Sequence, residues 1–158
     1  MRTEELAAAV LRQLAACGLK LATAESCTGG LIGKLLTDIP GSSAVYVGGV
    51  ISYVNDVKRR LLGVSEETLR AYTAVSRQTA VEMARGVRAA THADVGVSVT
   101  GLAGPDGDGT GRPIGLVYIA MDMENFSFNK ELQLSGTRAQ IREDAARAVF
   151  EMLLDGLS

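Results

Sequence analysis

Hydrophobic residues in the first part of the chain are spaced as in a helix and then as in strands. Leu6, Val10 and Leu14 recur about one helical turn apart, which predicts a helix over residues 3–17 that ends at Gly18. The apolar stretches that follow predict a strand, a short helix and a second strand at residues 19–24, 31–36 and 45–53. Helix and strand therefore alternate in this part of the chain.

The middle of the chain carries three residues that are typical of helix starts. Asn55 is predicted to cap a short helix, Ser65 a second short helix and Ser76 a longer one. Gly63 stands where the first of these helices would end. The sequence therefore predicts three consecutive helices after the second strand.

The last part of the chain predicts three strands and a helix, and it completes the fold class. The strands are expected at residues 94–100, 114–121 and 126–134, the last two joined by a turn at Glu124-Asn125. Thr137 and Gln140 form a capping box ahead of a helix over residues 139–154. Helices that alternate with strands early and a hairpin late predict an α/β fold, a three-layer α/β/α sandwich around a mixed sheet of about five strands.

Composition limits the class of protein. The 158 residues are 47% hydrophobic and 22% charged, so one globular domain over residues 1–158 is expected. No apolar run resembles a signal peptide or reaches the roughly 20 residues of a membrane helix. The net charge of −2, with four Tyr, three Phe and no Trp, argues against nucleic acid as a partner. Two cysteines without CxxC spacing indicate the reducing cytoplasm, and a single histidine, His92, leaves no His pair for a metal.

The turn at residues 25–30, Glu-Ser-Cys-Thr-Gly-Gly, is the first candidate site. It joins a predicted strand to a predicted helix start, where unpaired backbone N–H groups bind anions or oxyanions. Ser26 is the candidate nucleophile and Thr28 is a neighbouring hydroxyl, and the alternative is that one of them only caps the helix. Cys27 is either a rival nucleophile or a small buried hydrophobic residue.

A nucleophilic serine needs a base, and the one histidine is expected at a helix end, away from this turn. A lysine with a lowered pKa is the other choice. Lys58 follows the second strand, so it can converge with Tyr53 and Asn55 on one rim of the sheet. Arg59 and Arg60 would lower its pKa if they shared its surroundings. The alternative is that Lys58 belongs to a solvated charged face.

The glycine-rich stretch at residues 101–111 is the most unusual local composition. It lacks the Gly-Lys-Ser/Thr of a P-loop, the following helix of a dinucleotide site and the last glutamate of a calcium loop. Backbone amides near Gly101 and Gly104 could approach a ligand closely, whereas residues 106–111 are typical of a mobile surface loop. Arg138, at the start of the last helix, could contact a phosphate or carboxylate.

Several motifs in a fixed order carry a resemblance to a known family. They are Ala24-Glu25-Ser26-Cys27-Thr28-Gly29-Gly30, Tyr53-x-Asn55-x-x-Lys58, Leu62-Gly63-Val64, Ala74-Val75-Ser76, Ser98-x-Thr100-Gly101-x-Ala103-Gly104-Pro105 and Pro113-x-Gly115. Over nearly the whole chain this pattern resembles the CinA C-terminal domain family, whose enzymatic members are nicotinamide-nucleotide amidases. The amino-terminal domain of full-length CinA proteins has no counterpart in the sequence, so a stand-alone amidase domain is expected.

The resemblance implies hydrolysis of the carboxamide of nicotinamide mononucleotide (NMN) to nicotinate mononucleotide and ammonia, in pyridine nucleotide salvage. It implies Ser26 as the nucleophile and Lys58 as its base, acting directly or through Tyr53. Oxyanion and substrate-binding roles are expected for Thr28, Gly29, Gly30, Asn55, Thr100, Gly101, Gly104 and Arg138. No metal or organic cofactor is required, and self-association to a homo-oligomer is expected. The alternative is a catalytically silent domain that binds a nucleotide or a protein, in line with the competence and DNA-damage names of the family.

Overall fold

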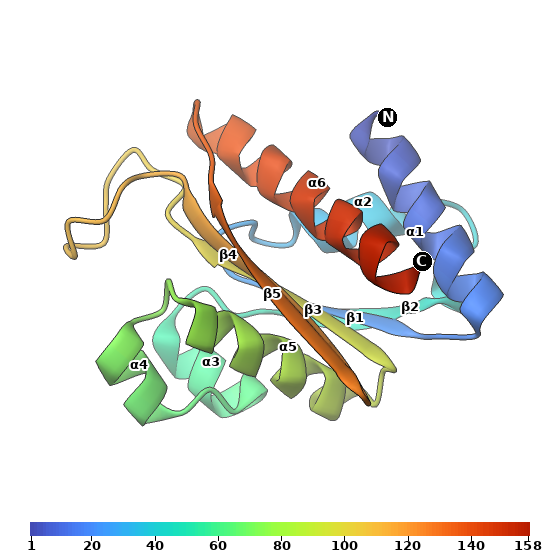
Figure 1. Ribbon diagram of the computed structural model, residues 1–158, viewed down its shortest axis with the longest axis horizontal. Helices are drawn as coiled ribbons and strands as arrows, with labels where there is room; N and C mark the ends of the chain where they lie inside the picture. Colours follow the sequence, from blue (N-terminus) through green and yellow to red (C-terminus); the bar gives the residue numbers. More distant parts are fainter.

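A mixed sheet of five strands forms the middle layer of the molecule. A computed structural model describes all 158 residues and places the strands in the order β2-β1-β3-β4-β5 (Figure 1). β1 (Leu21–Glu25) pairs in parallel with β2 (Tyr46–Ile51) and β3 (Val95–Gly101). β4 (Leu116–Met123) pairs antiparallel with β3 and with β5 (Phe126–Gln133). The predicted α/β fold around a mixed sheet is therefore confirmed.

Helices cover both faces of this sheet (Figure 1). One face carries α1 (Thr3–Cys17), α2 (Leu31–Thr37) and α6 (Arg138–Leu157), and the other carries α3 (Asn55–Leu62), α4 (Glu66–Tyr72) and α5 (Arg77–Thr91). A single 3-10 turn, Ser42–Ala44, precedes β2. None of the helices combines the length and the apolar character that crossing a membrane requires.

The main hydrophobic core lies between the sheet and the layer of α1, α2 and α6. Twenty-five buried residues form it, among them Leu14, Val97 and Phe150. On the opposite face α5 passes very close to α3, because a Cβ at Gly86 would lie 1.8 Å from the carbonyl oxygen of Leu62. Only glycine permits this approach, and the contact fixes the position of α3 on the sheet.

Local signals in the sequence locate most helix ends. The side chains of Ser65, Ser76 and Thr137 accept hydrogen bonds from backbone N–H groups in the first turns of α4, α5 and α6, as predicted. The prediction for Asn55 was wrong, since Val54 is the N-terminal cap of α3 and no side chain caps this helix. Asn55 is therefore the first helical residue, with its own backbone already helical.

Candidate functional site

A cavity of about 250 Å³ opens at the carboxyl ends of the parallel strands. Ser26 directly follows β1, Tyr53 lies two residues after β2, and Gly101 ends β3. Because parallel strands end at the same edge of a sheet, these segments meet there. The lining also includes Cys27, Lys58, Ala74, Val75, Thr100, Leu102, Ala103, Asp108 and Arg138.

Lys58 and Ser26 are in direct contact within this cavity. The Nζ of Lys58 donates a hydrogen bond to the Oγ of Ser26 at 2.9 Å. It also donates to the carbonyl oxygens of Ser52, at 2.6 Å, and Tyr53, at 3.4 Å. Only 1% of Lys58 and 8% of Ser26 is exposed. The structure therefore brings together the two side chains that the sequence singled out, and it buries both.

Burial controls the charge of Lys58. Desolvation lowers the pKa of Lys58 from 10.5 to about 8, and no ion pair holds its ammonium group. The expectation that Arg59 and Arg60 lower this pKa was wrong. Both arginine side chains are exposed and pair with Asp56, at 2.9 and 3.4 Å. A neutral lysine is therefore accessible near physiological pH through burial alone.

The three oxygen neighbours of Lys58 suit either of its charge states. An ammonium group donates to all three oxygens. A neutral amine has two N–H donors, which suffice for the carbonyl oxygens of Ser52 and Tyr53, and one lone pair, which can accept the O–H of Ser26. Loss of one proton therefore reverses the hydrogen bond to Ser26 and makes Lys58 the acceptor.

The buried carboxylate of Glu25 fills the start of α2. One of its oxygens accepts hydrogen bonds from the hydroxyl of Thr28 at 2.6 Å and from the N–H groups of Gly30 and Ile32 at 3.2 and 3.0 Å. The other oxygen accepts from the N–H of Gly33 at 2.9 Å. A negative charge at a helix N-terminus is stabilised by such donors. The anion that occupies these donors is therefore part of the protein.

This arrangement corrects the predicted oxyanion site. The N–H of Gly30 and the hydroxyl of Thr28 are already bonded to the carboxylate, and the N–H of Gly29 donates to the carbonyl oxygen of Ser26 at 3.1 Å. The backbone N–H groups of Cys27 and Thr28 donate to no acceptor in the protein. These two amides, directly after Ser26, are the donors that the turn leaves free for an oxyanion.

Cys27 lies beside Ser26 without being a rival nucleophile. It is 6% exposed and belongs to the main hydrophobic core, and burial raises the pKa of its thiol to about 12. At neutral pH the group is a protonated thiol, which is a poor nucleophile. Of the two interpretations of Cys27, the structure favours the small buried hydrophobic residue.

Tyr53 contributes two different groups to the cavity, and Asn55 contributes none. The carbonyl oxygen of Tyr53 faces Lys58, whereas its hydroxyl accepts a hydrogen bond from Nη2 of Arg138 at 3.3 Å. That hydroxyl makes no hydrogen bond to Ser26 or Lys58, whereas the Nζ of Lys58 contacts the Oγ of Ser26 directly. Asn55 is exposed and lies outside the cavity lining.

Thr100 and Gly101 shape the wall of the cavity. The hydroxyl of Thr100 donates to the carbonyl oxygen of Ala74 at 2.8 Å, so it is occupied within the protein. A Cβ at Gly101 would lie 2.6 Å from the side chain of Val117 in the next strand. Glycine is required there because β4 approaches the backbone closely. Both residues therefore determine the shape of the cavity wall, and neither offers a free hydrogen-bond donor from its side chain.

Arg138 is held at the cavity by two contacts. Its Nη1 donates to the carbonyl oxygen of Gly104 at 2.6 Å, and its Nη2 contacts the hydroxyl of Tyr53 described above. The carbonyl of Gly104 thus orients the arginine. The backbone N–H groups of Ala103 and Gly104 donate to no acceptor in the protein, and Ala103 lines the cavity. This end of the site combines a guanidinium with free backbone donors.

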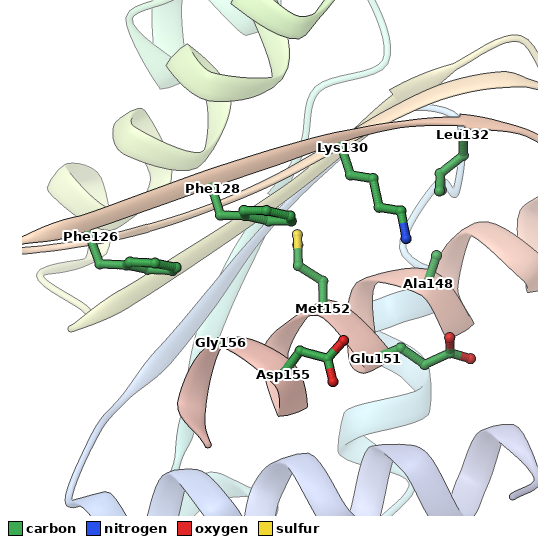
Figure 2. A pocket seen from close by; sticks show the side chains of 9 residues that line it. All are labelled: Phe126, Phe128, Lys130, Leu132, Ala148, Glu151, Met152, Asp155 and Gly156. Atoms are coloured by element: carbon green, nitrogen blue, oxygen red, sulfur yellow. The ribbon is translucent and has the colours of Figure 1, made fainter.

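A second hollow carries different chemistry. It is a groove of about 420 Å³ between β5 and α6. Figure 2 shows the residues that line it, which are Phe126, Phe128, Lys130, Leu132, Ala148, Glu151, Met152, Asp155 and Gly156. None of them supplies a hydroxyl, thiol or imidazole group.

No group of three or more His, Cys, Asp or Glu side chains is arranged anywhere in the structure to hold a metal ion. The cavity with Ser26 and Lys58 is therefore the candidate active site.

Comparison with known proteins connects this chain to one family. The family model described as CinA C-terminal domain matches residues 3–157. The chain is 45% identical over 150 residues to a competence-damage inducible protein of Caldanaerobacter subterraneus subsp. tengcongensis, and 43% identical over 150 residues to a CinA-like protein of Kosmotoga olearia. Each match covers 95% of this chain and 36% of the relative. The chain therefore spans about a third of the length of these curated relatives.

Solved structures show the same fold over their whole length. The competence/damage inducible protein CihA of Agrobacterium tumefaciens superposes with a TM-score of 0.93 at 44% identity, covering 97% of this chain and 94% of that one. The competence damage-inducible protein A of Klebsiella pneumoniae superposes with a TM-score of 0.97 at 36% identity, covering 99% and 98%. The fold is therefore shared with these proteins.

Proposed function

The chain belongs to the CinA C-terminal domain family, and on that premise we propose that it hydrolyses the carboxamide of NMN to nicotinate mononucleotide and ammonia. The 2.9 Å contact between the buried Nζ of Lys58 and the Oγ of Ser26 carries this proposal. A serine beside a lysine that can become neutral is a nucleophile with its base. This pair requires neither histidine nor a metal nor an organic cofactor.

In the first half of the proposed reaction, Ser26 attacks the carbon of the carboxamide. Neutral Lys58 takes the proton of the Ser26 hydroxyl as the new C–O bond forms. The oxyanion that develops on the carboxamide oxygen is bound by the free N–H groups of Cys27 and Thr28. Lys58, now an ammonium group, gives its proton to the leaving nitrogen, and ammonia departs from an acyl-serine ester.

In the second half, water takes the place of ammonia. Neutral Lys58 accepts a proton from the attacking water and returns it to the Oγ of Ser26 when the ester bond breaks. The nicotinate carboxylate is released as product, and the free serine is regenerated. One amide and one water are consumed, and one carboxylate and one ammonium ion are formed at neutral pH. Lys58 thus serves as base and acid in turn.

The charged end of NMN is proposed to lie at Arg138. The phosphate is a dianion, and the guanidinium of Arg138 presents donors at the cavity together with the free N–H groups of Ala103 and Gly104. The carboxamide would then lie at Ser26 and the sugar between the two ends.

Ammonia release from NMN tests the proposal. Purified protein without added metal is expected to form ammonia and nicotinate mononucleotide in equal amounts, measured by a coupled enzymatic assay and by chromatography. Thermal stabilisation by NMN without product would instead support a silent nucleotide-binding domain. That second function is compatible with the competence-damage names of the relatives.

The pH dependence of hydrolysis should follow Lys58. Its pKa of about 8 means that the ammonium form, which cannot accept a proton, predominates at lower pH. We expect kcat/KM to fall about tenfold for each pH unit below this value and to reach a plateau above it. A pH-rate profile from pH 6 to 10 measures this. A profile that is flat across this range would show that Lys58 is not the base.

Loss of Arg138 should weaken binding of the phosphate selectively. We expect Arg138→Gln to raise KM for NMN about tenfold, because a charge-assisted hydrogen bond is removed, and to leave KM for nicotinamide riboside, which lacks the phosphate, unchanged. Steady-state kinetics with both substrates measure this. Arg12→Gln, on the exposed side of α1, is the matched control. An equal effect on both substrates would place the phosphate elsewhere.

A further inference from the structure

The glycine-rich connection between β3 and β4 is closed at its base. The N–H of Leu102 donates to the carbonyl oxygen of Leu116 at 2.9 Å, and the N–H of Gly115 donates to the carbonyl oxygen of Leu102 at 2.7 Å. The segment between them, residues 103–114, is therefore a loop with both ends fixed next to the cavity. The prediction of a surface loop over residues 106–111 is confirmed by their exposure, but the loop is not free of the body of the protein.

Arg112 ties this loop to the connection between α4 and α5. Its guanidinium donates to the carbonyl oxygen of Val75 and, at 2.5 Å, to the hydroxyl of Thr73. Its Nε donates to the hydroxyl of Thr110 at 3.2 Å. One arginine therefore holds the tip of the loop against a neighbouring segment that itself lines the cavity.

The same network fixes the carboxylate of Asp108. Its Oδ1 accepts hydrogen bonds from the N–H and the hydroxyl of Thr110, at 3.1 and 2.5 Å. Its Oδ2 has one long contact, 3.5 Å to Nη2 of Arg112. Partial desolvation raises the pKa of Asp108, but the Thr110 hydrogen bonds and Arg112 outweigh it, so the net pKa is lowered and the group stays ionised at neutral pH. The carboxylate is thus fixed in position through Oδ1, and Oδ2 can accept further hydrogen bonds.

Asp108 is the one acidic residue in the cavity lining. Of the other polar side chains there, Ser26 and Lys58 bind each other, and Thr100 is occupied by a backbone carbonyl. Arg138 supplies positive charge for the phosphate. The acceptors that remain for hydroxyl donors of a ligand between these ends are the hydroxyl oxygens of Thr100 and Tyr53 and the carboxylate of Asp108, and of these only the carboxylate is charged.

We propose that Asp108 is a specificity-determining residue that accepts hydrogen bonds from the vicinal 2′- and 3′-hydroxyls of the substrate sugar. This rests on the proposed function, because it takes NMN as the ligand. A carboxylate accepts several hydrogen bonds and donates none when ionised, so it matches a cis-diol and repels a phosphate. Asp108 thereby fixes the orientation of the nucleotide, with the sugar towards the loop and the phosphate at Arg138.

The experiment measures binding without turnover. In protein carrying Ser26→Ala, calorimetric titration gives Kd for NMN and for its 2′,3′-dideoxy analogue, each with and without Asp108→Asn. We expect Asp108→Asn to weaken NMN binding about tenfold and to leave the affinity for the dideoxy analogue unchanged, since hydrogen bonds to a charged acceptor are lost only where the hydroxyls exist. Asp106→Asn, an exposed neighbour outside the cavity lining, is the matched control and should change neither affinity.

The outcomes separate this inference from the proposed function. Equal weakening of both ligands would overturn the inference, because Asp108 would then act on the ring charge or on the shape of the loop. Unchanged NMN affinity would overturn it as well. If NMN does not bind the Ser26→Ala protein and the unmodified protein releases no ammonia, both proposals fall. If Asp108→Asn weakens the binding of NMN but not of the dideoxy analogue, and the unmodified protein releases no ammonia, the proposed hydrolysis is rejected and the sugar site is retained.

Discussion

Replacement of Ser26 by alanine is expected to lower kcat for ammonia release from NMN by about 10⁴-fold or more, because the nucleophile is lost while binding groups remain. Kd for NMN should stay within about threefold, since an uncharged hydroxyl adds little to binding when its partner keeps other acceptors. Single-turnover kinetics together with calorimetric binding measure the two quantities separately.

The structure explains why this substitution should leave the fold intact. The one hydrogen bond of the Ser26 side chain is to the Nζ of Lys58. The N–H of Ser26 donates to the carbonyl oxygen of Val99, and its carbonyl oxygen accepts from the N–H of Gly29, so these backbone bonds do not depend on the side chain. Lys58 keeps the carbonyl oxygen of Ser52 as an acceptor. Ser43→Ala, at an exposed position, should leave kcat unchanged. Undiminished turnover after Ser26→Ala would reject the mechanism.

The fold was largely predictable because its signals are local. Gly18 and Gly63 end helices in left-handed conformations, and Ser65 and Ser76 cap the helices that follow them. Asn55 failed as a cap because the extended backbone after β2 ends at Val54, so that Asn55 is already helical. The side chain of Val54 offers no acceptor to the first turn, so the sequence carries no capping signal at the start of α3.

The sequence was sufficient to predict that Ser26 and Lys58 meet, but not which charged groups surround them. Parallel strands bring their carboxyl ends together, so motifs that follow β1 and β2 had to meet. The sequence also predicted free N–H donors at the start of α2. It did not show that Glu25, the last residue of β1 and six residues before the first residue of α2, would occupy them. Nor could residue order show that Arg59 and Arg60 point to solvent.

Replacement of Glu25 by alanine should cost roughly 3 kcal/mol of unfolding free energy, because four donors lose their acceptor in a buried place. Urea unfolding followed by circular dichroism measures this. The slope of the unfolding free energy against urea concentration, the m value, should stay unchanged. Glu67→Ala is the matched control. Glu67 also lies in the first turn of a helix, but it is exposed, and its loss should change stability by less than about 0.5 kcal/mol.

Glu25→Gln separates the hydrogen bonds from the charge. A glutamine carbonyl in place of Oε1 keeps the donors Thr28, Gly30 and Ile32, and only the N–H of Gly33 then faces an amide N–H₂. If acceptor oxygens supply the stability, glutamine should cost about 1 to 2 kcal/mol, well below the cost of alanine. If glutamine costs as much as alanine, the negative charge at the start of α2 is the stabilising feature. The turn that presents Ser26 to Lys58 would then be stabilised by the attraction between the charge of Glu25 and the N-terminus of α2, and not by the number of hydrogen bonds.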